Sequence, residues 1–279
     1  MIQKILLFIL GTLFIVACDL RQPPDEDAID RDAIYDETPI YNEETSQYPN
    51  DIEKFNDLLT NSKYQFPDSS TTVEYDQFDG YKTENFYVNE DDDFFFVVKK
   101  QADSEKIRNE LREGPESREW NTTDSDGNFW VSTLKCYKPK VGVSTYTWMQ
   151  VHGTNDTFDY PLIRLLWVRS RHSIYDHIWA IVIISSPDAD ERVYEWLDLG
   201  ERPTSFFDAA VYIQDNIMKV KIHNKVIKEY DVSYWENVTN YFKAGIYLNA
   251  YEDGGEGVVA FRELRFLDWA DPDYVTDSD

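Results

Sequence analysis

The chain has 279 residues, of which 53 are acidic and 27 basic, and its formal net charge is −26. This charge excludes a general nucleic-acid binder, because a phosphate backbone would be repelled over most of the surface. Two cysteines exclude a disulfide-rich scaffold. The aromatic share of 15% excludes wholesale disorder. The length suits one large all-β domain or two small domains.

The N-terminal residues 1–17 are typical of a secretion signal. One lysine precedes a continuous apolar run that ends at Ala17, and Cys18 follows directly. The end of the run resembles a bacterial lipobox, in which the cysteine becomes the lipidated first residue of the mature protein. The alternatives are an ordinary signal peptide and a single-pass anchor. We expect a lipid on Cys18 that anchors the protein to a membrane of the bacterial cell envelope, at the cell surface or on the periplasmic face.

Residues 18–50 are rich in acids and prolines and show no apolar period. This composition predicts a flexible tether that holds a globular part away from the membrane. We expect the globular part over residues 51–270, followed by an acidic, frayed tail over residues 271–279. With Cys18 lipidated, Cys136 is expected to be a buried structural thiol.

Short apolar or alternating runs fill the globular part. Apolar residues at helical spacing predict one short helix over residues 51–59, with Asp51 as its cap. Strands are predicted where β-branched and aromatic residues recur between turn residues, over residues 94–98, 128–135, 145–151, 162–168, 179–184, 210–214, 218–223, 241–249 and 257–266. This spacing predicts an all-β fold, a two-sheet sandwich or jelly roll.

The run RNELR places opposite charges on one face of a predicted strand. Alternate side chains of a strand point the same way, so Arg108, Glu110 and Arg112 would share a face while Leu111 points to the core. Two guanidiniums beside a carboxylate form a rigid anion-binding fork. The alternative is a solvated edge strand.

The run QVH places two polar side chains on one face of another strand. Gln150 can donate to a carboxylate, and His152 can move a proton near neutral pH. Trp148 would share this face and could stack on a sugar ring. By itself such a tripeptide is weak support for a site.

The run YFKAGIYLN carries a third set of polar residues. Lys243, Tyr247 and Asn249 would alternate onto one face, where Gly245 leaves room for a ligand to approach the backbone. A cation beside a tyrosine favours the phenolate. The alternative is an ordinary aromatic-rich strand.

In this order and spacing, the three runs resemble the signature strands of alginate lyases of polysaccharide lyase family 7. The resemblance covers roughly residues 54–268. It implies a β-jelly roll of two antiparallel sheets with a concave groove for an acidic polysaccharide, and cleavage of the 4-O-glycosidic bond of alginate by β-elimination. It implies neither a metal nor a cofactor, and we expect a monomer. The chain departs from the family pattern at Asn109, usually Ser or Thr, and at Asn249, usually Gln.

The resemblance also implies catalytic roles. β-Elimination removes the C5 proton of a uronate, which is weakly acidic until the adjacent carboxylate is neutralised. Arg108 and Gln150 would neutralise it, with His152 close by. Tyr247 would protonate the leaving O4. On mannuronate, where the C5 proton and O4 lie on the same side, Tyr247 could serve as base and acid. On guluronate His152 would be the base.

Five further positions are implied to bind substrate, and Glu110 would also orient the two arginines; they are Glu110, Arg112, Trp148, Lys243 and Asn249. Two other functions stay open: a non-catalytic glycan-binding surface lipoprotein, and a lyase for another uronan. The intact pair of Tyr247 and His152 argues against a pure binder, which has no need of proton-transfer groups. The remaining histidines show no spacing typical of a metal site.

Overall fold

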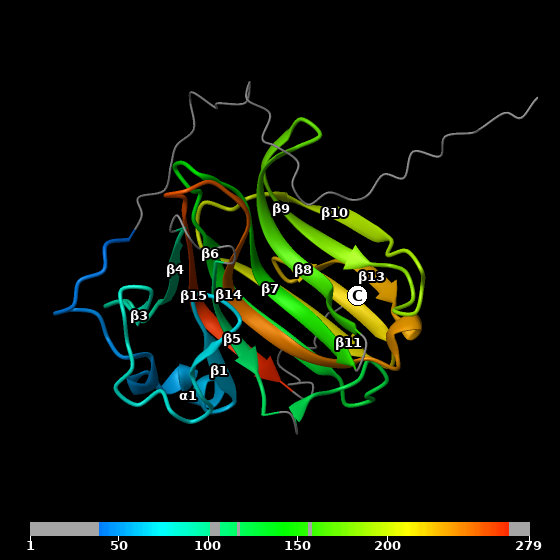
Figure 1. The fold of residues 1–279 in the computed structure, drawn as a ribbon, viewed down its shortest axis with the longest axis horizontal. Helices are drawn as coiled ribbons and strands as arrows, with labels where there is room; N and C mark the ends of the chain where they lie inside the picture. The colour runs from blue at the N-terminus through cyan, green and yellow to red at the C-terminus, as the bar shows by residue number, and fades with distance from the viewer. Residues whose placement is uncertain (1–38, 101–106, 116–117, 156–157, 268–279) are drawn as a thin grey trace, which may run out of the picture.

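The computed structural model describes residues 39–100, 107–115, 118–155 and 158–267. The predicted signal, Cys18, most of the predicted tether and the acidic tail lie outside these residues. Two antiparallel sheets make up the fold (Figure 1). The all-β class and the two antiparallel sheets predicted from the sequence are therefore confirmed.

The larger sheet has eight strands in the order β10-β9-β8-β7-β14-β5-β1-β2. Their bounds are β1 Ser62–Gln65, β2 Thr71–Val73, β5 Arg108–Glu113, β7 Val143–Asn155, β8 Phe158–Arg171, β9 Ile174–Ile183, β10 Tyr194–Glu201 and β14 Thr239–Tyr251.

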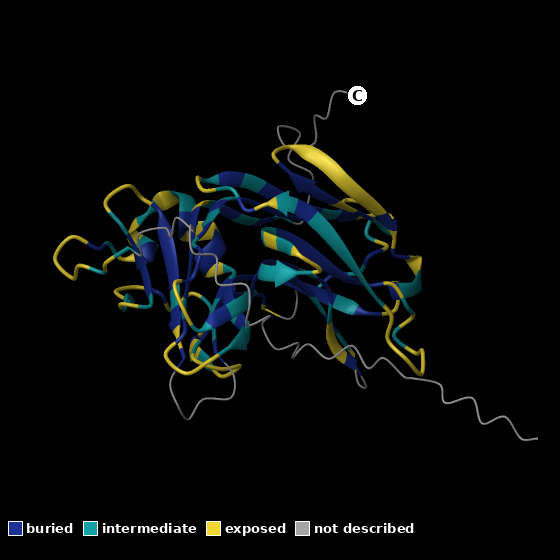
Figure 2. Cartoon of the chain, turned by 90° about the horizontal axis from the view of Figure 1, so that it is seen from above, coloured by how far each residue is buried: buried dark blue, intermediate teal, exposed yellow. Residues whose placement is uncertain are grey.

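The smaller sheet has seven strands in the order β13-β12-β11-β6-β15-β4-β3. Their bounds are β3 Phe86–Val88, β4 Phe94–Lys99, β6 Asn128–Cys136, β11 Phe207–Gln214, β12 Ile217–Ile222, β13 Lys225–Asp231 and β15 Glu256–Leu267. At the edge of this sheet, every residue of β13 except Tyr230 is exposed, which contrasts with the largely buried inner strands of the two sheets (Figure 2).

The core lies between the inner faces of the two sheets. Its largest fully buried side chains are aromatic and include Trp130, Trp148, Trp167 and Trp235. Every second residue of a strand points into this core, so the residues between them in the larger sheet point outward. Cys136 is a buried thiol, as predicted.

The predicted helix exists but begins later than expected. Helix α1 runs over Glu53–Thr60 and buries Phe55, Leu58 and Leu59. Asp51 does not cap it, because Asp51 lies in the preceding 3-10 turn η1 (Pro49–Asp51) and Ile52 occupies the N-cap position. Among the residues that the structure describes, no helix is long and apolar enough to span a membrane.

The predicted tether is too long at its C-terminal end. Tyr41 packs edge-on against Tyr87, with ring centroids 5.0 Å apart. Gln47 forms a bridge with Val88, and its side chain also bonds the backbone oxygen of Asn89. These contacts attach the last residues of the predicted tether to β3, so the folded part begins before residue 51.

Candidate active site

The register of the larger sheet aligns the predicted site residues in cross-strand rows. The central row runs over β5, β14, β7 and β8 and consists of Arg112, Lys243, Gln150 and Arg164. A second row consists of Arg108, Tyr247 and Thr147. A third pairs Tyr241 with His152. Cross-strand partners point to the same face, and the intervening residues Leu111, Val151, Ala244 and Ile246 are fully buried in the core. The rows therefore lie on the outer face of the larger sheet.

Glu110 lies at the centre of the polar side chains in these rows. Its carboxylate accepts a hydrogen bond from Gln150 Nε2 at 2.5 Å. The Nε atom of Arg108 lies 3.5 Å from Glu110 Oε2, and Lys243 Nζ lies 3.8 Å from the same oxygen. The Glu110 side chain is only 2% exposed. One buried anion therefore holds an amide and two cations in a fixed arrangement.

Arg112 is held by a different set of groups. Its guanidinium donates to Glu119 Oε1 at 2.8 Å and to the Tyr75 hydroxyl at 3.1 Å, and it lies over the Tyr241 ring at 3.9 Å. The expected pairing of Glu110 with both arginines thus holds for Arg108 alone. Two of the five N–H donors of Arg112 are thus engaged by protein groups, which holds the guanidinium in place beside the Tyr241 ring.

The proton-transfer candidates lie on either side of the central row. The Arg108 guanidinium lies 4.9 Å from the Tyr247 ring centre, which places a cation beside the phenol as the sequence predicts. His152 Nδ1 lies 3.1 Å from the Tyr241 hydroxyl. Burial, followed by the charges of Lys243 and Arg108, holds the pKa of His152 well below its usual range. The imidazole is therefore neutral near pH 7.

Most of the chain matches a known family. Residues 57–268 match the family model described as alginate lyase. The chain belongs to the alginate lyase family. An alginate lyase of Photobacterium sp. (strain ATCC 43367) is 25% identical over 257 residues, which cover 78% of this chain and 87% of the relative.

Solved structures show the same fold. Alginate lyase AlyC3 superposes with a TM-score of 0.70 at 20% identity, covering 83% of this chain and 99% of that one. Alginate lyase A1-II', a member of polysaccharide lyase family 7, superposes with a TM-score of 0.59 at 20% identity, covering 75% and 95%. The predicted jelly roll and the predicted membership of polysaccharide lyase family 7 are confirmed.

Trp148 is a correction to the sequence prediction. The register between β7 and β8 shifts between Thr147 and Met149, so a bulge turns Trp148 and Met149 both to the core, where each is fully buried. The Trp148 ring packs against Trp130 and Phe207, with centroids 5.7 and 6.1 Å away. Strict alternation fails at the bulge, and Trp148 supports the sheet instead of stacking on a sugar.

Gly245 is a second correction. Its φ of +136° lies in the region that favours glycine. A Cβ atom there would lie 2.2 Å from the backbone oxygen of Asn109 and 2.8 Å from Glu110 Cα. The glycine therefore lets β5 approach β14 closely, and the room it leaves is filled by the neighbouring strand rather than by a ligand.

Two residues of the site, Gln65 and Thr147, were missed by the sequence motifs. Gln65 of β1 accepts a hydrogen bond from Lys243 Nζ at 2.9 Å, and Thr147 donates to Asn249 Oδ1 at 2.7 Å. Arg164, half-buried in the central row, interacts electrostatically with Tyr247. Gln65 and Thr147 lie outside the quoted runs, and their contacts depend on strand register.

Lys243 gives the site a pH dependence. Burial, opposed by Glu110, lowers the pKa of Lys243 to about 8. Raising the pH through 8 is therefore expected to remove a cation from the cluster and to raise KM for alginate several-fold. Initial rates measured from about pH 6 to about pH 10, on both sides of this pKa, would show the rise in KM. In Lys243→Met, KM should be high at every pH; a rise that persists unchanged in this variant would contradict the assignment.

Two further observations concern other sites. Among the described residues, no group of three or more histidine, cysteine, aspartate or glutamate side chains is placed to hold a metal ion.

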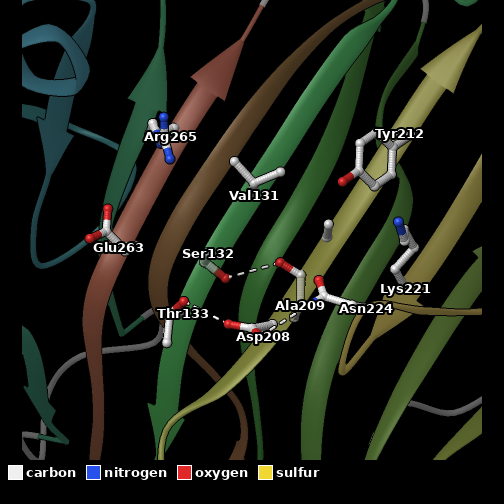
Figure 3. Close-up of a pocket in the computed structure, with 11 residues that line it drawn as sticks. Val131, Ser132, Thr133, Asp208, Ala209, Tyr212, Lys221, Asn224, Glu263 and Arg265 are labelled. Atoms are coloured by element: carbon white, nitrogen blue, oxygen red, sulfur yellow. Dashed lines mark hydrogen bonds between the residues drawn. The ribbon is translucent and has the colours of Figure 1, made fainter. Parts of the chain in front are cut away.

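A hollow lies on the smaller sheet, over β6, β11, β12 and β15 (Figure 3). Asp208 there accepts hydrogen bonds from Thr133 and Asn224. This hollow contains none of the residues of the family motifs.

Proposed function

We propose that this alginate lyase cleaves the 4-O-glycosidic bond by β-elimination on the outer face of its larger sheet. The observation that carries the proposal is the placement of Arg108 and Gln150 on one buried carboxylate, Glu110, with Tyr247 beside Arg108. The relative AlyC3 has been solved in complex with dimannuronate, which supports a mannuronate-containing substrate.

Arg108 and Gln150 neutralise the carboxylate of the uronate whose C5 proton is removed. Both groups are donors held by Glu110, so they are oriented before substrate binds and need not reorganise as negative charge builds up. The ionised oxygen of Tyr247 then accepts the C5 proton and becomes a hydroxyl. The C4=C5 double bond forms as the C4–O4 bond breaks, and the proton passes from Tyr247 to O4. Lys243 lies beside Gln150 in the central row and adds positive charge that attracts the polyanion.

The test is a direct assay of the full-length chain on separate mannuronate-rich and guluronate-rich alginates. The unsaturated uronate product absorbs ultraviolet light, and we expect this absorbance to rise with time on at least one polymer. A rise on another uronan and on neither alginate would favour a different substrate. Binding to alginate with no product would favour the non-catalytic glycan-binding function.

We further propose that the protein is a lipoprotein of the bacterial cell envelope. The support is the sequence alone: an apolar run that ends at Ala17 and is followed by Cys18, then an acidic segment suited to a tether. Cys18→Ser is expected to abolish incorporation of a labelled fatty acid and to move most of the protein out of the membrane fraction. Equal incorporation in this variant would contradict the lipid anchor.

A further inference from the structure

Tyr241 lies between two of the predicted site residues. It is paired with His152 across β14 and β7, and its hydroxyl lies 3.1 Å from His152 Nδ1. The two rings are nearly parallel, at 13°, with centroids 5.2 Å apart. The guanidinium of Arg112 lies over the Tyr241 ring at 3.9 Å. Tyr241 is only 6% exposed, so its position is fixed by protein groups.

The protonation of both partners is set by their surroundings. The cations Lys243, Arg108 and Arg112 all disfavour a charged imidazole at His152, whereas a backbone hydrogen bond at Gly153 favours it. The carboxylate of Asp159, whose side chain is 79% exposed, lies 3.6 Å from Nδ1. Burial raises the pKa of Tyr241, although Arg112 opposes the shift. Near pH 7 the pair therefore holds one phenolic proton and one imidazole proton.

The direction of the hydrogen bond follows from the buried phenolic proton. A buried O–H donor needs an acceptor, and His152 Nδ1 is the acceptor that the described residues offer to Tyr241. If Nδ1 carried the imidazole proton and donated it to the tyrosine, the phenolic proton would lose this acceptor. Donation from Tyr241 to Nδ1 satisfies both groups and leaves the imidazole proton on Nε2.

We propose that Tyr241 is a positioning residue that fixes His152 as the tautomer with its proton on Nε2, so that His152 donates a hydrogen bond to the bound uronate and does not accept the C5 proton. The inference rests on the proposed function. It departs from the expectation that His152 is the base on guluronate, and it makes Tyr247 the base for every residue cleaved.

A substrate preference follows from a single base. On mannuronate Tyr247 can take the C5 proton and return it to O4 on the same side, while C4=C5 forms and C4–O4 breaks. His152 neither gains nor loses a proton in this step. On guluronate the two atoms lie on opposite sides, so one side chain cannot reach both. The enzyme should therefore prefer mannuronate-rich alginate by about tenfold or more.

The tautomer can be measured without any assay of activity. The full-length chain has four histidines, so ¹⁵N-histidine NMR gives few signals, and those of His152 are identified by their loss in His152→Gln. We expect the shifts of the tautomer protonated on Nε2, and in Tyr241→Phe a change towards a mixture of tautomers. Shifts of the tautomer protonated on Nδ1 in the unaltered protein would overturn the proposal.

Kinetics supply the second readout. Tyr241→Phe is expected to lower kcat/KM on mannuronate-rich alginate about tenfold and to reduce the mannuronate-to-guluronate ratio, because Nε2 becomes able to accept a proton. Tyr75→Phe is the matched control: it removes a hydroxyl bonded to Arg112 but leaves the bond between Tyr241 and His152. Its ratio and its NMR shifts should stay unchanged.

The outcomes separate this inference from the proposed function. No turnover on either alginate by the unaltered enzyme would end the proposed function, while the NMR shifts would still decide the tautomer. Equal losses on both polymers in Tyr241→Phe, with the His152 shifts unchanged, would show that the tyrosine only supports the fold and would overturn the inference.

Discussion

Replacing Tyr247 with phenylalanine is expected to lower kcat on alginate by about three to four orders of magnitude, because one phenolic oxygen both removes the C5 proton and then protonates O4. The substitution deletes a single oxygen from a half-buried side chain and leaves the ring beside Arg108. Binding should therefore change little. Release of unsaturated uronate gives kcat, and calorimetric titration with an oligomannuronate gives the affinity.

The control for this variant is Tyr175→Phe. Tyr175 lies on β9 of the same sheet and is 48% exposed, and it belongs to none of the rows that contain the site. Its kcat should stay within about twofold of the unaltered enzyme. A Tyr247→Phe enzyme that retained a tenth of its turnover would show that another group carries the proton to O4.

Much of the fold could be predicted from residue patterns. The nine strands predicted from apolar runs all appear, because each run faces the core, and the strand predicted at RNELR appears as β5. The structure lengthens several of them, such as β7, which extends to Asn155. The strands that escaped prediction include β13, whose exposed edge position allows a charged sequence with no apolar face, and β3, which is only three residues long.

The site was predicted less evenly than the fold. Alternation places Arg108 and Glu110 on one face correctly, because β5 pairs with β14 in an unbroken register there. The same rule fails for Trp148, where a bulge in β7 changes which side the chain presents. Bulges arise from pairing with neighbouring strands, so a strand's own sequence does not reveal them.

The role of Tyr241 could not be read from its motif. It belongs to the same run as Lys243 and Tyr247, and alternation alone puts all three on one face. Its contact with His152 requires the register between β14 and β7, which the sequence does not contain. The same register brings Arg112 of β5 close to its ring.

Glu110→Gln is expected to cause the largest loss of stability among these variants. The carboxylate of Glu110 is the buried anion between Arg108 and Lys243. Without it, the buried Lys243 and the half-buried Arg108 face each other uncompensated, which costs about 3–5 kcal/mol of unfolding free energy. For a domain of this size the melting temperature should fall by roughly 10 °C. Glu229→Gln is the matched control, because Glu229 pairs with Lys219 in an exposed ion pair and its loss should cost less than about 1 kcal/mol.

The loss in Glu110→Gln should also depend on pH. Glu110 raises the pKa of Lys243 against the effect of burial, so removing it should move that pKa further below about 8. Above its folded-state pKa the native protein holds fewer protons on Lys243 than the unfolded chain does, so stability rises with pH up to the unfolded-state value of 10.5. The deficit of the variant should therefore be largest near pH 6–7 and shrink by about pH 9.

A second substitution separates the ion pairs of Glu110 from its hydrogen bond with Gln150. Adding Lys243→Met to Glu110→Gln removes one of the two uncompensated cations, so the double variant should recover part of the lost stability and lose its pH dependence. Urea unfolding at several pH values measures both effects. If the double variant is less stable than Glu110→Gln at pH 7, the ion pair is not what Glu110 contributes. The loss would then come from the hydrogen bond with Gln150, which depends little on pH.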